Sequence, residues 1–319
     1  YNNMDNKLFD KPFRIGLLLT EGFALMSYAS LIEPLRAANL LAGRELYRIT
    51  DIAVQSSRIR SSSGAIIPTN DATSDTFDLV LIITGGDPQK LENSTLLDTL
   101  RRLSRSKTIV GGVSGGPYIL AAAGLMHGYR MTVHWEHAPS MQERWPELLL
   151  ERSLYILDRK RITCAGGTAP MDLMHYLISE HHGHDFARTV SDWFMHTDFR
   201  PAAGPQRAGL VERIGVTDRA ILDTIEAMEN HISDPLNLLE LSRIAGVSSR
   251  QLNRLYQLKL NITTMGYYRN IRLEMAQNLL RNSSLSVTEI SLATGFSGSA
   301  HFSSCYSQKY GTSPSSHRR

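Results

Sequence analysis

The stretch "GGVSGGPYILAAAGL", residues 111–125, joins an apolar run to a helical pattern rich in small residues. The run that leads into it, "KTIVGGV" (107–113), is typical of a buried strand. Gly112-Val113-Ser114-Gly115-Gly116 matches G-x-S-x-G, the strand-to-helix turn that exposes a nucleophilic serine in many hydrolases. The stretch predicts an α/β fold, and it raises the question of whether the chain is an enzyme.

Short apolar runs alternate with helical patterns over the first two-thirds of the chain. Strands are expected at 13–20, 47–54, 77–86, 107–113, 130–135 and 153–167, and the last helices of this part at 169–183 and 185–197. Apolar strands that alternate with helices predict a doubly wound parallel sheet covered on both faces. Pro34 lies inside the helical pattern at 25–43 and predicts a kink or break there.

The composition indicates a protein without a membrane anchor. No apolar run approaches the roughly 20 residues that span a bilayer, and the first residues, "YNNMDNKLFDKP", lack the apolar stretch of a signal peptide. The two cysteines, Cys164 and Cys305, fall in different parts of the chain, which makes a disulfide framework improbable. We therefore expect a cytoplasmic protein.

The 319 residues are enough for two domains. "DFRPAAGPQRAG" (198–209) is rich in Pro, Gly and Ala, so we expect one domain at 13–197, a linker at 198–216 and a second domain at 217–319. Residues 240–319 hold ten Lys and Arg against three Glu, whereas residues 1–204 hold 21 basic and 22 acidic residues. A basic block at one end favours a polyanionic partner there, although a solvated charged surface is the alternative.

An internal repeat lies in this basic part. "LLELSRIAGVSSRQLNRLYQLKLN" (238–261) is echoed by "VTEISLATGFSGSAHFSSCYSQKYG" (287–311), with Gly246 matching Gly295. Each copy predicts a helix, a glycine turn and a second helix, and residues 263–282 predict one long amphipathic helix between the copies. Two helix-turn-helix units on a rigid connecting helix suit DNA, because two readers must lie roughly 34 Å apart to enter the same face of the duplex.

Residues from about 217 to 319 resemble the DNA-binding domain of the AraC/XylS family of bacterial transcription regulators. The resemblance rests on "LSRIAGVSSRQLNRLY", "IRLEMAQNLL" and "EISLATGFSGSAHFSSCYSQKYGTSP". It implies a double-stranded DNA operator and RNA polymerase as partners. The residues expected to contact DNA are Ser249, Arg250, Gln251, Asn253 and Arg254 in the first unit and Ala300, His301, Ser303, Ser304 and Lys309 in the second.

The two predicted recognition helices differ in charge. Arg can read guanine and Asn can read adenine, although any one of these side chains is about as well suited to a phosphate contact. In the second helix Ser304 stands where the family commonly has Arg, and Ser307-Gln308 replaces its usual basic pair. We therefore expect the first unit to carry more of the affinity, so that Arg254→Ala abolishes operator binding and Ser304→Ala weakens it modestly.

Residues 13–197 resemble the PfpI-like branch of the class I glutamine amidotransferase superfamily, which has a flavodoxin-like fold. The matching stretches are "GFALMSYASLIEPLRAAN" (22–39), "DLVLIITGG" (78–86), "GGVSGGPYILAAAGLMHGYRMTVHWEH" (111–137) and "ITCAGGTAPMDLMHYLISEHHG" (162–183). With the C-terminal match, this implies a GlxA-type regulator. The family's elbow holds a cysteine with a nearby glutamate; Ser114 takes the cysteine position and Ser27 falls near the glutamate position, so we expect a degenerate elbow without catalysis.

Ligands of open parallel sheets bind at the carboxyl ends of the strands. The residues expected at that rim are Glu21, Gly86, Asp87, Ser114, Gly115, His134 and Trp135. Backbone N–H groups after Ser114 are expected to hold a carboxylate, and Trp135 to stack on an ammonium group unless it only packs at a strand end. This predicts a zwitterionic effector, and the resemblance implies amino acids such as arginine or betaine-like and carnitine-like amines.

The leading interpretation is a homodimeric regulator, by resemblance an activator, with no cofactor. The alternative from another class is a serine hydrolase or amidase that uses Ser114 and His134, with Glu21, Glu33 or Asp87 orienting the histidine. In a third interpretation the first domain only dimerises. The histidines at 181, 182 and 184 and the pair at 134 and 137 match no known ligand spacing, so we expect no metal site.

Overall fold

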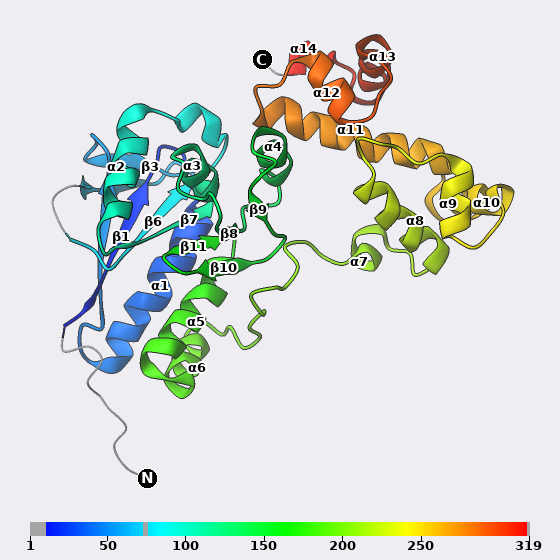
Figure 1. The fold of residues 1–319 in the computed structure, drawn as a ribbon. Coiled ribbons are helices and arrows are strands. Elements are labelled where there is room, and N and C mark those ends of the chain that lie inside the picture. The colour runs from blue at the N-terminus through cyan, green and yellow to red at the C-terminus, as the bar shows by residue number, and fades with distance from the viewer. Residues whose placement is uncertain (1–10, 73–75, 318–319) are drawn as a thin grey trace. The chain divides into compact units, whose positions relative to one another are not determined.

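The computed structural model describes residues 11–72 and 76–317. The chain separates into two compact units, the first ending at Gln206 and the second beginning at Arg207 (Figure 1). Each unit has its own hydrophobic core, and the two are described separately below.

The first unit is built on a seven-stranded sheet in the order β10-β11-β7-β6-β1-β2-β5. The strands are β1 (Phe13–Leu19), β2 (Tyr47–Ala53), β5 (Asn70–Asp71), β6 (Leu79–Thr84), β7 (Ile109–Ser114), β10 (Tyr155–Asp158) and β11 (Arg161–Cys164). Every neighbouring pair is parallel except β10 with β11, which form an antiparallel edge. The predicted mostly parallel, flavodoxin-like sheet is confirmed.

Two shorter sheets stand apart from the central one. β3 (Arg58–Arg60) pairs with β4 (Ile66–Pro68), and β8 (Arg130–Met131) pairs with β9 (Leu149–Leu150). The prediction of a strand at 130–135 is therefore wrong beyond Met131, because residues 132–137 form a loop that leads into α4. The strands expected within 153–167 are confirmed, and they form the β10–β11 hairpin.

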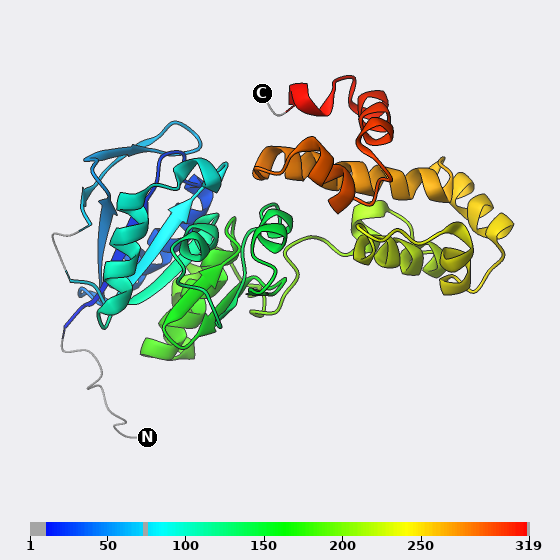
Figure 2. The same ribbon diagram turned by 45° about the horizontal axis from the view of Figure 1, so that its top comes forward.

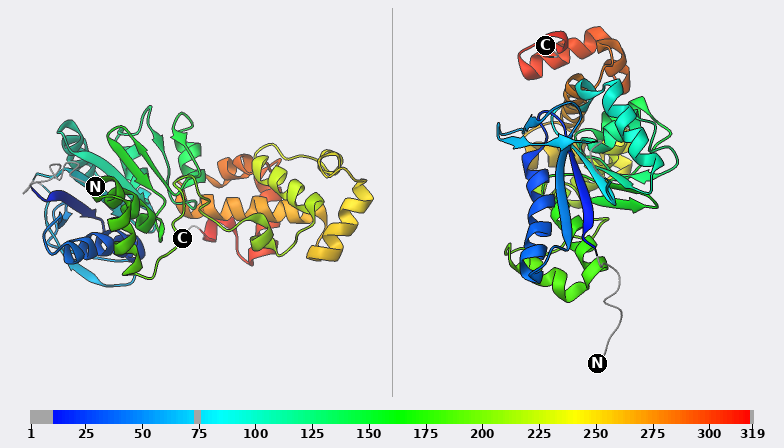
Figure 3. Two further views of the ribbon diagram at one scale, coloured as in Figure 1. Left: turned by 90° about the horizontal axis from the view of Figure 1, so that it is seen from below. Right: turned by 90° about the vertical axis from the view of Figure 1, so that its left-hand side faces the viewer.

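Helices cover both faces of the central sheet (Figure 2). Its helices are α1 (Leu25–Ala42), α2 (Ser94–Arg105), α3 (Gly116–Ala122), α4 (Ala138–Arg144), α5 (Ala169–His182) and α6 (His184–Asp192), with a 3-10 turn, η1, at Pro88–Leu91. Side chains alternate along each strand, so Leu17 joins the core under α1, α5 and α6, whereas Leu18 joins the core under α2 and α3. Figure 3 shows α1 and α2 on opposite sides of the sheet. Pro34 does not break α1, which continues through it.

The described part of the second unit contains helices and no strand. They are α7 (Leu210–Ile214), α8 (Arg219–Asn230), α9 (Leu238–Ile244), α10 (Ser249–Leu260), α11 (Thr264–Asn282), α12 (Val287–Ala293), α13 (Ser299–Tyr310) and α14 (Pro314–His317). Capping boxes start α9 and α12, at equivalent places in the two copies of the repeat. The long helix α11 contributes Tyr268 to a core with α8–α10 and Leu273 to a core with α12 and α13. One helix therefore supports both helix-turn-helix units.

Much of the expected linker, 198–216, is packed against one unit or the other. Arg200 binds Asp172, and Gln206 binds the Val133 carbonyl, both inside the first unit. Leu210 and Ile214 of α7 belong to the core of the second unit. The division into 13–197, 198–216 and 217–319 stays a prediction. No helix in the described ranges is long and apolar enough to cross a membrane.

Candidate functional site

Ser114 ends β7 in a left-handed conformation, with φ of 61°. This conformation costs a non-glycine residue roughly 1–2 kcal/mol, because Cβ approaches the following carbonyl oxygen. The glycines beside it permit the sharp turn into α3: a Cβ on Gly112 would lie 2.5 Å from the carbonyl carbon of Gly116, and one on Gly116 would collide with the Ile82 carbonyl. The chain thus has the strained strand-to-helix elbow that G-x-S-x-G predicts.

A second hydroxyl lies beside Ser114. A Cβ on Gly166 would lie 2.7 Å from the Ser114 Cβ and 3.0 Å from the Ser27 Oγ, so these two serines meet across Gly166. The Gly167 N–H donates to the Ser27 Oγ at 2.9 Å, and both serine side chains are buried. Two serine hydroxyl groups therefore lie near each other at the elbow.

Two histidines of the loop before α4 lie against the elbow. The His134 N–H donates to the Ser114 carbonyl at 3.3 Å, and the His137 Nε2 lies 3.4 Å from where a Cβ on Gly115 would stand. Burial lowers the pKa of His134. The pKa of His137 is lowered to about 4, mainly by burial and to a smaller extent by the nearby His134. Both rings are therefore neutral at pH 7. The His137 Nδ1 is buried without a hydrogen-bond partner among the described residues.

The hydrogen bonds of His134 do not fit a catalytic base. In a serine triad the base donates from Nδ1 to a carboxylate and accepts the serine proton at Nε2. Here the His134 Nδ1 accepts the Glu136 N–H at 3.3 Å, so the neutral ring carries its proton on Nε2. The three carboxylates considered as orienting groups are bonded elsewhere: Glu21 to the Arg60 N–H, Glu33 to Arg36, and Asp87 to the Gln89 N–H and Lys90.

The remaining rim residues meet the expectation in part. The Gly115 N–H already donates to the Thr84 carbonyl, and Pro117 has no N–H, so fewer donors face a ligand than a carboxylate site at this helix would need. Trp135 is 43% exposed, and its ring lies 5.3 Å from that of His134. Gly86 is left-handed, in the turn that precedes Asp87. His137 was not among the predicted ligand residues, although its spacing of three from His134 placed it in the same loop.

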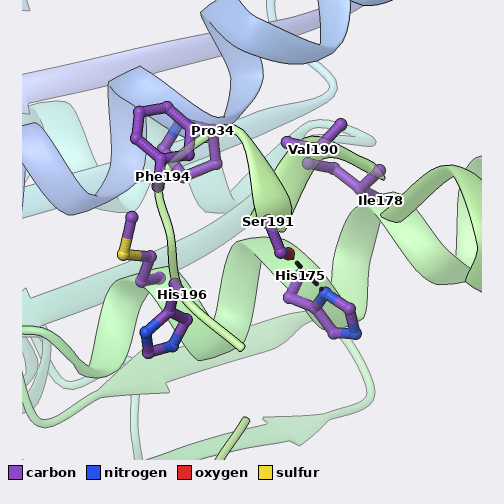
Figure 4. Close-up of a pocket in the computed structure, with 8 residues that line it drawn as sticks. Pro34, His175, Ile178, Val190, Ser191, Phe194 and His196 are labelled. Carbon is purple, nitrogen blue, oxygen red and sulfur yellow. Dashed lines mark hydrogen bonds between the residues drawn. The ribbon is translucent and has the colours of Figure 1, made fainter. Parts of the chain in front are cut away.

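A small hollow lies between α1, α5 and α6, and Ser114 does not line it (Figure 4). Its lining residues are Pro34, Met171, His175, Ile178, Val190, Ser191, Phe194 and His196. With a cavity volume of about 10 Å³, it has room for one water molecule at most and is too small for an organic effector.

Nowhere in the described ranges do three or more His, Cys, Asp or Glu side chains gather as a metal site would require. The histidines that end α5 pack instead. The His181 Nδ1 lies 3.1 Å from the Tyr47 hydroxyl, and the His181 and His182 rings contact that of Tyr47. Burial lowers the pKa of both.

In the first helix-turn-helix unit, Gly246 makes the turn between α9 and α10 with φ of 66°. Arg250, Gln251 and Arg254 are exposed on the side of α10 opposite its buried residues. Asn253 is half-buried, and its Oδ1 accepts the Thr264 N–H at 3.1 Å, the first N–H of α11. A bidentate adenine contact needs both the oxygen and the nitrogen of an asparagine amide, so this bond argues against that contact.

Ser249 is also engaged within the unit. Its hydroxyl donates to the Ser242 Oγ at 3.2 Å, which ties the start of α10 to α9. Of the five residues expected to contact DNA here, two therefore hold the fold together, and three are presented to solvent.

In the second unit, α13 exposes Ala300, His301 and Ser304, with Ser303 half-buried. Lys309 is directed elsewhere: its ammonium donates to the Asn270 carbonyl and to Glu274, each at 3.0 Å. These bonds attach α13 to α11 and argue against the expected DNA contact by Lys309.

Arg272, which the sequence analysis did not single out, attaches the turn between α12 and α13 to α11. It donates to the Thr294 carbonyl at 2.7 Å, and its guanidinium lies 4.2 Å from the centre of the Phe296 ring. Its partner residues adjoin Gly295, and only the fold brings them to α11. The long helix therefore fixes the orientation of the second unit through Arg272 and Lys309.

A serine at a strand-to-helix elbow in a doubly wound sheet, followed by two helix-turn-helix units on one helix, is the architecture of a transcription regulator with an α/β first domain. The DJ-1/PfpI family model matches residues 13–180, and a helix-turn-helix domain model matches residues 241–319. The chain belongs to the DJ-1/PfpI family, among the members that carry an AraC-type helix-turn-helix domain.

Full-length relatives agree with this assignment. The chain is 45% identical to the HTH-type transcriptional regulator GlxA of Rhizobium meliloti, over 96% of this chain and 95% of that protein. It is 37% identical to the HTH-type transcriptional regulator CdhR of Pseudomonas aeruginosa, over 94% and 90%. The solved structure of an AraC family transcriptional regulator from Pseudomonas putida covers 57% of this chain and all of that chain, with 26% identity and a TM-score of 0.53. The chain is a DNA-binding transcription regulator, and these relatives are named as regulators rather than enzymes.

Proposed function

We propose that the first unit binds a small metabolite at the Ser114 elbow and that this binding controls transcription. The observation that carries the proposal is the set of groups gathered there: the hydroxyls of Ser114 and Ser27 and the neutral ring of His137, whose Nδ1 has no partner among the described residues. Buried polar atoms are normally bonded, so an unbonded one beside an elbow without an activated nucleophile suits binding better than catalysis.

The effector is an amino acid or a quaternary amine. Trp135 is 43% exposed, and a tryptophan ring attracts cationic groups. The Glu136 carboxylate lies 4.0 Å from the His134 Nδ1 and adds negative charge to the same loop. Uncharged donors and acceptors at Ser27, Ser114 and His137 suit the polar end of such a molecule. The opposite arrangement, with a carboxylate at the start of α3, has less support because the Gly115 N–H is already bonded.

The second unit binds an operator with both recognition helices. The chain acts as a homodimer, contacts RNA polymerase and activates its target genes, as the AraC/XylS resemblance implies. An effector changes DNA binding only if it binds the two functional states of the regulator with different affinity.

A thermal-shift screen of amino acids, glycine betaine and carnitine tests the effector site. A ligand at 100 times its Kd stabilises the folded chain by about 2.7 kcal/mol, which for a unit of this size raises Tm by about 5–10 °C. Trp135→Ala should abolish the shift. Trp193→Ala, which removes a similarly exposed tryptophan (50%) at the end of α6, should retain it. A screen with no hit, or equal losses in both variants, would favour a first unit that only dimerises.

A further inference from the structure

Residues 198–206, here called the strap, carry the chain from the first unit toward the second. At one end of the strap, Arg200 binds the buried Asp172 carboxylate through its backbone N–H at 3.0 Å and its guanidinium at 2.6 Å. The same guanidinium donates to the Thr168 Oγ1 at 2.9 Å. Thr168 follows Gly166 and Gly167, whose backbone closes over Ser114 and Ser27. The strap therefore holds one of the two loops that flank the elbow.

The other end of the strap holds the second loop. The Gln206 Nε2 donates to the Ser153 carbonyl at 2.8 Å, and to the Val133 carbonyl and the Thr132 Oγ1, each at 3.0 Å. Two carbonyl acceptors fix the amide with its nitrogen inward. Val133 precedes His134, whose N–H donates to the Ser114 carbonyl. A continuous set of bonds thus leads from the elbow through His134 and Val133 to Gln206.

Gln206 is a weakly balanced anchor. Its Oε1 is buried with no partner among the described residues, and leaving a carbonyl unbonded costs as much as its amide nitrogen gains. Arg200 is the firm anchor, because Asp172 accepts several charge-assisted bonds from it. A small change at Val133 is therefore enough to release Gln206, whereas release stops at Ala202, whose carbonyl accepts the Leu154 N–H at 2.8 Å just after the firm Arg200 anchor.

Release of Gln206 changes the length of the tether to the second unit. Leu210 already belongs to the core of that unit. From a docked Gln206 the chain reaches Leu210 over four residues, at most about 14 Å; from Ala202, which stays bonded to Leu154, it spans eight residues, about 28 Å. The effective concentration of a tethered binding unit depends strongly on such reach.

We propose that ligand binding at the Ser114 elbow and docking of Gln206 stabilise each other, so that the strap converts occupancy of the site into a short tether for the DNA-binding unit. This inference rests on the proposed effector function. The coupling is reciprocal. A ligand that stabilises the loops at Ser114 also stabilises the docked strap, and undocking of the strap weakens ligand binding.

The test places a known occupant at the elbow of the full-length chain. Ser114→Cys supplies a thiol. After the thiol loses its proton to solvent, the thiolate attacks the CH2 carbon of iodoacetamide, a sulfur–carbon bond forms and iodide leaves, so that a small amide group stays on the sulfur. Cys164 is fully buried and burial raises its pKa to about 12, so its labelling reports global unfolding. Hydrogen exchange of the strap, including the bonded Arg200 and Gly204 N–H groups, is compared before and after alkylation.

Alkylation should slow exchange in the strap by about tenfold while Cys164 stays unlabelled. Gln206→Ala in the same background should remove this response. Arg48→Ala, which removes a surface pair with Glu45 in the same unit, should retain it. Full alkylation with unchanged or faster strap exchange, or a response that survives Gln206→Ala, overturns the coupling and leaves the ligand site standing. A thiol that iodoacetamide does not reach in the folded chain overturns both.

Discussion

Arg254→Ala and Ser304→Ala probe equivalent places in the two recognition helices. Arg254 is exposed on α10 together with Arg250 and Lys259. In α13, Ser304 is exposed and the single basic residue, Lys309, is bonded to α11. Of the two recognition helices, α10 therefore carries the exposed lysine and arginine side chains, and the two substitutions should differ in both the size and the salt dependence of their effect on DNA affinity.

The expected magnitudes follow from the chemistry of each side chain. Losing an arginine contact to a base or a phosphate costs about 1–3 kcal/mol, or roughly 5–150-fold in Kd. Losing one hydroxyl hydrogen bond costs about 0.5–1.5 kcal/mol. If Arg254 binds phosphate, its removal also lowers the salt slope by about 0.9, so its loss shrinks about 3.5-fold between 50 and 200 mM salt. Ser304→Ala carries no charge and should leave the slope unchanged.

Fluorescence anisotropy, with a duplex selected from a random library by the unaltered chain, measures both quantities across a salt series. Lys309→Ala is a third arm: it should lower the free energy of unfolding and leave the salt slope within error, because its ammonium is bonded within the protein. Equal losses and equal slopes for Arg254→Ala and Ser304→Ala would refute the unequal division of affinity.

Three further predictions concern stability and chemistry. Gly246→Ala should lower the free energy of unfolding in urea by about 1–2 kcal/mol, the cost of a left-handed alanine. Gly295→Ala should cost about 2–5 kcal/mol, because its Cβ would also lie 2.5 Å from a proline ring carbon; equal costs would contradict this packing. Between pH 6.5 and 4 the unfolded chain protonates His137 and the folded chain does not, so this group alone should lower the free energy of unfolding by about 3 kcal/mol as pH drops through this window, and His137→Asn should remove that share of the pH dependence. A fluorophosphonate probe should leave Ser114 unlabelled. Labelling of the unaltered chain that is lost in Ser114→Ala would support the serine hydrolase interpretation instead.

The sheet and the helix-turn-helix units were predictable because their signals are local. Apolar runs gave the strands of the central sheet, and the glycines around Ser114 could serve only a tight turn. The loop after β8 was misassigned because "RMTVHW" has strand-like residues, yet the Thr132 N–H donates to the side chain of Thr163 rather than continuing the ladder. Propensity within a short run does not reveal which partner strand is present.

The site was only partly predictable because its contacts join distant residues. Ser27 and Ser114 meet across Gly166, and Gln206 reaches a loop some 70 residues earlier in the chain. A helical pattern can say that a side chain points outward, but not whether another helix lies there. The outward position of Asn253 predicts a base-reading residue, whereas in the structure α11 begins there and the Asn253 oxygen accepts its first N–H.

The internal repeat shows how far sequence equivalence extends. Gly246 and Gly295 occupy the same turn, yet a Cβ meets nothing within 4 Å at the first and collides with Pro235 and the Ile232 carbonyl at the second. By contrast, Arg254 and Ser304 occupy matched positions and are both exposed. Because the fold presents these two positions alike, the difference between the two readers lies in the side chains themselves, and replacing Ser304 by arginine should raise affinity and steepen the salt slope by about 0.9.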